Sequence, residues 1–345
     1  MYALRQPTYL RPSRQVASPS QYTHNSYCLS PRLKGIASFS TTPPFSAKVR
    51  VGPGKDSFAK ARFTTADVPS LDFWATKARP PLVDGLSPEE CLATAQKYTA
   101  LALREPVNWR KNLTTQHGIS LYTLHYIANM IITGPPSPAW NLATHILYTN
   151  VKLSYTPSVL TMVRLALMRN RLGGQQFLPA EEAFERLLAQ RDDPDVCTLK
   201  GLIYAGKNAR ETDDKALEWF RLARRLGGEE PRAWDWQSSC IMGLAKIYLK
   251  QNKTKQAKDI LHYAAVTLDI PEACWLYATT LSEDDASRPS WLKKAAISGI
   301  PAAARELAHV ESRRLSDGSL SKGEMAEKQA LADEWLGIAG DKALY

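Results

Sequence analysis

The sequence predicts an all-α fold, a right-handed superhelical solenoid in which pairs of α-helices stack one after another. Apolar residues recur at helical spacing from about residue 88 onward, and short turns marked by Pro or Gly separate these segments. Related groups of residues also recur along the second half of the chain. No segment has the alternation of polar and apolar residues that indicates a half-buried strand. Helices with internal recurrence are typical of a helical repeat protein.

Residues 1–41 have the composition of a mitochondrial targeting presequence. Eight basic residues and no acidic residue precede Asp56, and Ser, Thr and aromatic residues are frequent, without the apolar core of a secretory signal. The electrical potential across the mitochondrial inner membrane draws positive charge inward, with a free-energy gain of about 2 kcal/mol per charge per 100 mV. We therefore predict a mitochondrial protein of the matrix, cleaved between Gly35 and Ser46. The alternative is the basic tail of a cytosolic protein, and prolines at positions 7, 12, 19 and 31 count against a long presequence helix.

The positive charge of the chain is concentrated in this N-terminal region. Of its 44 Lys and Arg residues eight precede Asp56, so the remainder has 36 basic against 34 acidic residues. The net charge of +10 would by itself favour a nucleic-acid or anionic-membrane partner. A body so close to neutral has no overall field that attracts phosphate backbones. No apolar stretch reaches the roughly 18–20 residues of a membrane span, so we expect no transmembrane segment and leave peripheral contact open.

Residues 42–86 are expected to form an extended or disordered arm. The segment is rich in Pro, Ser, Thr and Lys, and Pro43-Pro44, Gly52-Pro53-Gly54 and Pro80-Pro81 interrupt regular structure. Within it, Leu71-Asp72-Phe73-Trp74 places large apolar groups in polar surroundings. We expect these side chains to pack back onto the folded body, with contact to a partner as the alternative.

Residues 87–345 are predicted to form one α-helical repeat domain. Ser87, followed by Pro88 and two acidic residues, is the signature of a capped helix start. The pairs Gly173-Gly174 and Gly227-Gly228 follow Arg-rich segments and predict left-handed residues at helix ends. Helices are expected at residues 88–104, 118–133, 138–153, 157–172, 180–190, 195–206, 213–226, 235–251, 254–268, 271–282, 289–298, 301–315 and 321–339.

Three stretches of the second half match one another. Residues 200–204 followed by 215–220 correspond to 244–248 followed by 255–257, and again to 273–278 followed by 291–296, while a fourth unit begins at Pro301. These residues resemble the Sel-one-like branch of the tetratricopeptide (TPR) repeats, which has a small residue and Tyr on the first helix and Lys-Ala, an aromatic residue and Ala-Ala on the second. The resemblance covers 195–310 clearly and 157–191 weakly. It implies a scaffold whose curved surface binds a partner.

Small residues at recurring positions are expected to let neighbouring helices approach closely, and aromatic residues to fill the gap to the next pair. One helix pair cannot bury its own apolar side, so stability is expected to come from stacking. The predicted repeat-packing residues are Gly201, Tyr204, Ala216, Trp219, Ala223, Ala245, Tyr248, Ala257, Ala264, Ala273, Trp291, Ala295, Ala296 and Gly299.

The sequence shows no motif of known catalytic or cofactor chemistry. It has no H-E-x-x-H, no G-x-S-x-G, no phosphate-binding glycine loop that opens a helix and no dinucleotide fingerprint. The cysteines are scattered without a C-x-x-C pair, which favours a reduced compartment and free buried thiols. His125 and His145 lie in apolar helical segments, where a shared site and two separate core histidines are both conceivable. We therefore predict no enzyme activity, no cofactor and no metal.

Candidate partner-binding residues lie around the start of the helix expected at 235–251. Trp234 and Trp236 are separated by one residue, so both cannot face the same core ridge, and one is expected to be exposed for binding. Arg221 and Arg225 are candidates for contact with an acidic peptide or RNA, although a solvated helix face explains them as well.

The sequence thus predicts a non-enzymatic mitochondrial scaffold or adaptor that binds a protein client. The settings considered are respiratory-complex assembly and the mitochondrial ribosome. The alternative is an RNA-binding helical repeat protein of mitochondrial gene expression. The irregular repeat length and the near-neutral body count against RNA as the partner.

Overall fold

The computed structural model describes residues 58, 60–77, 86–315 and 320–340, and within these ranges every regular element is a helix. The all-α class is therefore confirmed for this part of the chain. The predicted presequence at 1–41 lies outside the described residues, as do residues 42–57, 59 and 78–85 of the predicted arm.

The thirteen helices expected from the sequence are all present, and their ends agree with the expected ones to within four residues. They are α2 (Pro88–Arg104), α3 (Leu121–Ile132), α4 (Ala139–Lys152), α5 (Thr156–Met168), α6 (Leu178–Gln190), α7 (Pro194–Ala205), α8 (Arg210–Gly227), α9 (Gln237–Lys250), α10 (Thr254–Val266), α11 (Pro271–Thr279), α12 (Arg288–Ile297), α13 (Pro301–Leu315) and α14 (Lys322–Ala339). The period of the apolar residues was therefore sufficient to locate them.

The segment before α2 is more ordered than the sequence suggested. It contains the 3-10 helix η2 (Thr65–Asp67) and the helix α1 (Leu71–Lys77), both inside the arm that was expected to be extended or disordered. Trp74 is completely buried, and its indole Nε1 donates to the Pro69 carbonyl at 2.9 Å. The expected packing of this apolar group onto the chain's own body is confirmed, because Trp74 belongs to the core formed with α2–α7.

The structure has the helix ends predicted at Ser87 and Gly228, but not the one predicted at Gly173. Ser87 and Glu90 cap α2 reciprocally: the Ser87 hydroxyl accepts from the Glu90 N–H at 3.1 Å, and the Glu90 carboxylate accepts from the Ser87 N–H at 2.8 Å. Gly228 ends α8 with φ +80°. Gly173 also has a positive φ, but α5 already ends at Met168 and the Gly173 N–H donates to Glu181 of α6. The prediction of a helix cap at Gly173 is therefore wrong.

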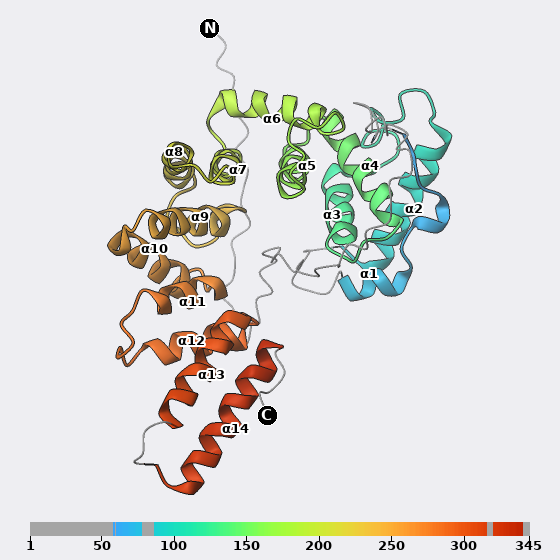
Figure 1. Cartoon of the computed structure of the whole chain (residues 1–345). Coiled ribbons are helices and arrows are strands. Elements are labelled where there is room, and N and C mark those ends of the chain that lie inside the picture. The colour runs from blue at the N-terminus through green and yellow to red at the C-terminus, as the bar shows by residue number, and fades with distance from the viewer. Residues whose placement is uncertain (1–57, 59, 78–85, 316–319, 341–345) are drawn as a thin grey trace, which may run out of the picture. The chain divides into compact units, whose positions relative to one another are not determined.

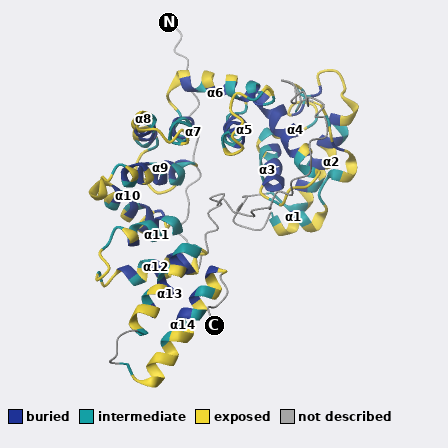
Figure 2. Cartoon of the chain, viewed as in Figure 1, coloured by how far each residue is buried: buried dark blue, intermediate teal, exposed yellow. Residues whose placement is uncertain are grey.

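The helices pack in the order in which the chain makes them. Each helix from α1 to α14 contacts the next, and the further substantial contacts join helices two apart, α4 with α6, α5 with α7 and α7 with α9 (Figure 1). Buried residues follow the sides that face neighbouring helices, whereas α14 is largely exposed apart from Ala332, Trp335 and Ala339 (Figure 2). Contacts between near neighbours alone are the property that defines a helical solenoid.

The buried apolar residues form two clusters that meet at α7. Val196 and Leu199 belong to the first cluster, which contains side chains of α1–α6, and Cys197 belongs to the second, which continues to α14. Half-buried Trp219 and Trp236 pack against both clusters. Helix α7 therefore connects the two cores.

The closest packing within the second cluster surrounds the ring of Phe220 on α8. A Cβ added to Gly201 of α7 would lie 2.6 Å from this ring, and a Cβ added to Gly243 of α9 would lie 2.5 Å from it. Phe220 is completely buried. The two glycines thus allow α7 and α9 to approach the same ring closely.

Replacing Gly243 by Ala should destabilise the chain. The added methyl group gains roughly 1 kcal/mol of helix propensity, but overpacking against a rigid ring costs about 1–3 kcal/mol. We expect a net loss of up to about 2 kcal/mol, measured by urea unfolding followed by circular dichroism. Gly337→Ala is the matched control: a Cβ at this α14 position meets nothing within 4 Å, so stability should rise by about 0.5–1 kcal/mol. Equal effects of the two substitutions would contradict the close approach at Phe220.

Candidate interaction surface

The structure places both tryptophans of the predicted binding site inside the chain's own packing. Trp234 is 9% exposed, and its indole lies so close to Gly227 that a Cβ there would be 2.2 Å from its Nε1. Trp236 is half-buried, and the guanidinium of Arg164 on α5 lies 4.9 Å from its ring centroid. Neither side chain is exposed, so both join the turn before α9 to earlier helices.

Trp236 is also connected to α7 through a half-buried carboxylate. Its backbone N–H donates to Asp195 Oδ1 at 2.8 Å. Burial raises the pKa of the Asp195 carboxyl to about 7, the hydrogen bond from Trp236 opposes this rise, and the nearby carboxylates of Asp235 and Asp193 add to it. This contact holds the start of α9 against the start of α7.

Arg221 and Arg225 are both exposed on α8, one turn apart. Arg221 donates to the Tyr248 hydroxyl of α9 at 3.2 Å, which holds its guanidinium against the neighbouring helix. Arg225 has no hydrogen bond or ion pair within the described part of the chain. Arg225 is therefore the more accessible of the two predicted cations.

Most of the predicted repeat-packing residues lie in the second cluster or against it. Those that are buried are Gly201, Ala216, Ala223, Ala245, Tyr248, Ala257, Ala264, Ala273, Ala295 and Ala296. Gly299 instead lies in an exposed turn with φ +87°. Tyr204, Trp219 and Trp291 are half-buried and contribute to both the core and the surface.

Three lysines surround the half-buried ring of Tyr204. The Nζ atoms of Lys200, Lys207 and Lys215 lie 5.7, 5.3 and 6.0 Å from its centroid. Lys200 precedes Tyr204 by one turn of α7, whereas Lys215 is contributed by α8. A cation within about 6 Å of an aromatic face is attracted by the electrons of the ring. The ring of Tyr204 therefore attracts lysine side chains of both helices.

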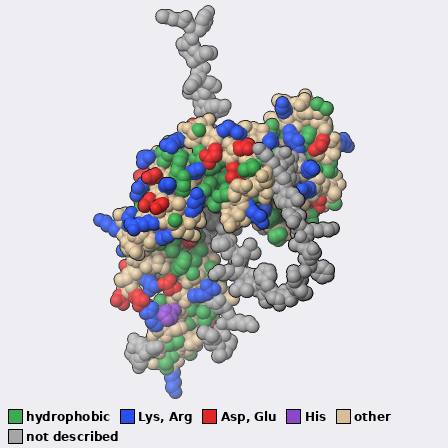
Figure 3. All heavy atoms as spheres, turned by 45° about the horizontal axis from the view of Figure 1, so that its top comes forward, with side chains coloured by type: hydrophobic (Ala, Val, Ile, Leu, Met, Phe, Trp, Pro, Cys, Tyr) green, Lys and Arg blue, Asp and Glu red, His purple; other side chains and the backbone are tan. Residues whose placement is uncertain are grey.

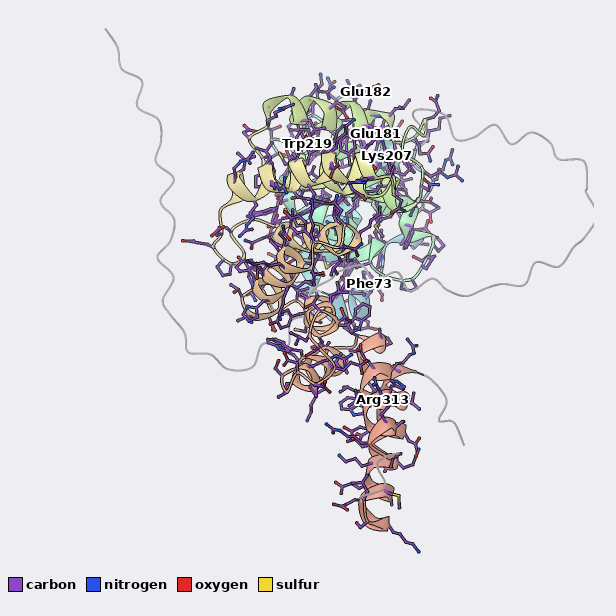
Figure 4. The ribbon with its side chains drawn as sticks, turned by 60° about the vertical axis from the view of Figure 1, so that its left-hand side comes forward. Phe73, Glu181, Glu182, Lys207, Trp219 and Arg313 are labelled. Atoms are coloured by element: carbon purple, nitrogen blue, oxygen red, sulfur yellow. The ribbon has the colours of Figure 1, made fainter. Side chains whose placement is uncertain are left out.

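Trp219 extends this surface along α8. It follows Lys215 by one turn, and the Arg191 guanidinium at the end of α6 lies 5.3 Å from its ring. Lys200 also forms an ion pair with Glu185 of α6 at 3.0 Å. Figure 4 labels Lys207 and Trp219 on the α7–α8 pair, and Glu181 and Glu182 on neighbouring α6.

We call the surface formed by Tyr204, Trp219, Lys200, Lys207, Lys215 and Arg191 the α7–α8 edge. It presents two aromatic rings that pack on the core, with cationic side chains over them. Lys207 and Lys215 have no carboxylate partner within the described residues, so their charge is available to a ligand. Tyr, Trp and Arg are enriched at the centres of protein interfaces whereas Lys is depleted there, so Tyr204, Trp219 and Arg191 fit such a centre and the lysines fit its rim.

The α7–α8 edge was only partly visible in the sequence. Tyr204 and Trp219 were predicted as packing residues, but none of the cations around them was predicted as a binding residue. A lysine one turn before each aromatic residue, Lys200 before Tyr204 and Lys215 before Trp219, is the signal that could have found them. Arg191 could not have been found in this way, because it reaches Trp219 from another helix.

A similar aromatic group recurs further along the chain. The rings of Tyr277 on α11 and Trp291 on α12 lie 5.3 Å apart, and exposed His262 of α10 lies 5.2 Å from Tyr277. Lys294 lies 5.9 Å from Trp291, but it also forms an ion pair with Asp269. Its charge is therefore compensated, unlike that of Lys207 and Lys215. Figure 3 shows basic side chains dispersed among acidic and hydrophobic ones, without one continuous basic field on the visible face.

The two histidines considered for a shared site belong to separate hydrogen-bond networks. His125 Nδ1 lies 3.0 Å from the Ser158 hydroxyl, and burial lowers the pKa of His125 to about 4. His145 Nδ1 lies 2.8 Å from the hydroxyl of buried Tyr98. Each histidine thus connects helices of the first cluster, as two separate core histidines would.

The cysteines and acidic residues provide no reactive cluster in the described part of the chain. Cys91, Cys197, Cys240 and Cys274 are buried free thiols. Burial raises the pKa of Cys240 to about 12 and that of Cys197 to about 11, which disfavours the nucleophilic thiolate. No group of three His, Cys, Asp or Glu residues that could hold a metal ion occurs there. No helix in the same ranges is long and apolar enough to cross a membrane.

Comparison with known proteins gives structural likeness but no sequence match. No family model matches the chain, and no curated protein matches it significantly. Among solved structures, it is similar to a protective antigen present in uropathogenic Escherichia coli strains, described as displaying an SLR fold. The TM-score is 0.45 at 13% sequence identity, over 79% of this chain and 68% of that one. The fold assignment rests on the helices and contacts described above.

Replacing Asp195 by Asn should change how stability depends on pH. The pKa of Asp195 is about 7 in the folded chain and near 3.8 when unperturbed, so the folded state binds an extra proton between about pH 4 and pH 7. The contribution of Asp195 to stability therefore rises as the pH falls through 7. Asn keeps the acceptor for the Trp236 N–H without the charge. We expect Asp195→Asn to be more stable than the parent at pH 8 and the difference to shrink at pH 5, in urea unfolding. Asn at exposed Asp259 is the control and should show no such convergence.

Proposed function

We propose that this protein is a non-enzymatic scaffold of the mitochondrion that binds a protein client at the α7–α8 edge. The observation that carries the proposal is the pair of core-anchored rings, Tyr204 and Trp219, covered by cations from three helices. Rigid aromatic residues supply large contact areas at little entropic cost. The resemblance to Sel-one-like repeats supports the same type of function.

The charge of the edge indicates which client segment it fits. Lys207 and Lys215 lack carboxylate partners within the described ranges, and exposed Arg225 lies further along α8. An acidic segment would gain ion pairs with these lysines while its apolar side chains pack on the rings. The client is therefore a protein with an exposed acidic and aromatic or aliphatic segment. Assembly of a respiratory complex and the mitochondrial ribosome are the settings in which we expect it.

The proposed location depends on the composition of residues 1–41. A basic, acid-free segment rich in hydroxylated residues supports import across the inner membrane. The near-neutral body supports a protein client in preference to RNA, because strong phosphate binding requires a concentrated basic surface.

Reversing charge at the α7–α8 edge should release the client. We expect Lys207→Glu combined with Lys215→Glu to reduce the recovery of one defined protein by about tenfold or more in crosslinking from intact mitochondria. Glu at exposed Lys253, directly before α10, and at exposed Lys255 of α10 gives a matched double control and should leave recovery unchanged. Recovery that is lost on RNase treatment would instead favour the RNA-binding alternative. Equal recovery of the client with both double variants would show that the α7–α8 edge does not bind it.

The mitochondrial location can be tested separately with isolated mitochondria. The full chain should become protease-protected in a potential-dependent manner and be shortened near residues 35–46, because the basic segment responds to the membrane potential. A variant with Arg5, Arg11 and Arg14 replaced by Gln should be imported several-fold less efficiently. Potential-independent protection, or none, would contradict matrix targeting.

A further inference from the structure

A small hollow lies beside the N-terminal turn of α4, in the first cluster and separate from the α7–α8 edge. Its volume is about 190 Å³, below the roughly 300–1,000 Å³ of pockets that enclose a whole drug-sized ligand. We call it the basic hollow. It is lined by Phe58, Lys60, Arg62, Asn141, Thr144, Arg169 and Gln176.

The charges around the basic hollow are all positive. Lys60, Arg62 and Arg169 contribute three cations, and no acidic side chain lines it. None of the three forms an ion pair within the described part of the chain. Burial lowers the pKa of Arg169, and no carboxylate counters that effect. Three uncompensated cations around one hollow repel one another, so a bound anion would be stabilised there.

Neutral hydrogen-bond donors complete the lining. The side-chain amides of Asn141 and Gln176 make no hydrogen bond to any other described residue. The Thr144 hydroxyl is already used, because it donates to the Trp140 carbonyl at 2.9 Å. No side chain caps the N-terminal turn of α4, and such a turn has a partial positive charge. Guanidinium, ammonium and amide donors therefore surround one space.

The segment before α1 contributes Phe58, Lys60 and Arg62 to the lining of the hollow and is anchored independently of any ligand. The ring of Phe58 lies 5.4 Å from that of Phe177, in an edge-to-face arrangement. Phe63 is buried and lies 5.1 Å from the ring of His145. Arg169 lies at the end of α5 with its guanidinium 5.2 Å from the ring of Trp140. These ring contacts hold the Arg169 guanidinium and the two phenylalanines beside Lys60 and Arg62 in place before an anion binds, which reduces the entropic cost of binding.

We propose that the basic hollow binds the phosphate group of a small phosphorylated molecule. A phosphate group offers several acceptor oxygens and up to two negative charges, and guanidinium groups bind it with paired hydrogen bonds. The three positive charges around the hollow exceed the one negative charge of a carboxylate, so a phosphate group neutralises them better. The volume suits one such group, with the rest of the molecule outside. This site is additional to client binding and does not depend on it.

Calorimetric titration of the purified full chain at low salt tests this site, with inorganic phosphate, pyrophosphate and AMP as separate probes. We expect saturable binding of one molecule per chain, and acetate should bind at least about tenfold more weakly than phosphate. The order of affinity among the three probes distinguishes a free phosphate from a phosphate ester. An absence of saturable binding by all three, or acetate binding as tightly as phosphate, would overturn the proposal.

Two variants assign the binding to the basic hollow. Arg62→Gln should weaken it by about tenfold or more, because one charged hydrogen bond is lost. Asn141→Asp places a carboxylate at the same hollow and should abolish binding, although an acidic residue in the first turn of α4 favours the helix. Circular dichroism should therefore show both variants folded. Arg225→Gln removes an exposed cation on α8 and should have no effect. Binding unchanged by both hollow variants would place the anion elsewhere and refute the site.

Discussion

The structure depends on the fact that no helix pair in it can bury its own apolar side. Phe220 shows this constraint most directly: its ring belongs to α8, but it is enclosed by Gly201 of α7 and Gly243 of α9. Helices one or two apart in the chain supply nearly all of the substantial contacts. Stability is therefore distributed along the stack, and each unit requires the next. The absence of a Cβ at two positions decides how closely successive helices approach.

The same constraint determines which surfaces remain for binding. At α7 the two cores meet, and Tyr204 and Trp219 can be only half-buried there because their inner sides pack on the core while their outer sides meet solvent. Cations from α6, α7 and α8 lie over these rings. The basic hollow has a related origin, since the segment before α1 brings Arg62 to the ends of α4 and α5. Both surfaces combine rigid aromatic support with uncompensated positive charge.

The helices were predictable because each depends mainly on the period of its own apolar residues and on local start signals such as Ser87 with Glu90. The repeat-packing positions were predicted by comparing the chain with itself; of these, Ala257, Ala264 and Ala296 are buried and Gly299 is exposed. Helix α1 was not predicted, since seven residues between proline-rich stretches give too few turns for a periodic signal. The expectation of an exposed tryptophan at 234 or 236 also differed from the structure, because their burial depends on Gly227, Arg164 and Asp195 from three other segments.

The sequence by itself determined the helical class and the approximate positions of the thirteen helices α2–α14, because these properties depend on spacing within a few turns. Only the tertiary structure decided which aromatic residues reach the surface and which cations surround them. Lys215 and Arg191 approach Tyr204 and Trp219 from different helices, and Arg62 approaches Arg169 across about a hundred residues. Such proximity depends on how helices stack, and the spacing of residues within one helix does not contain that information.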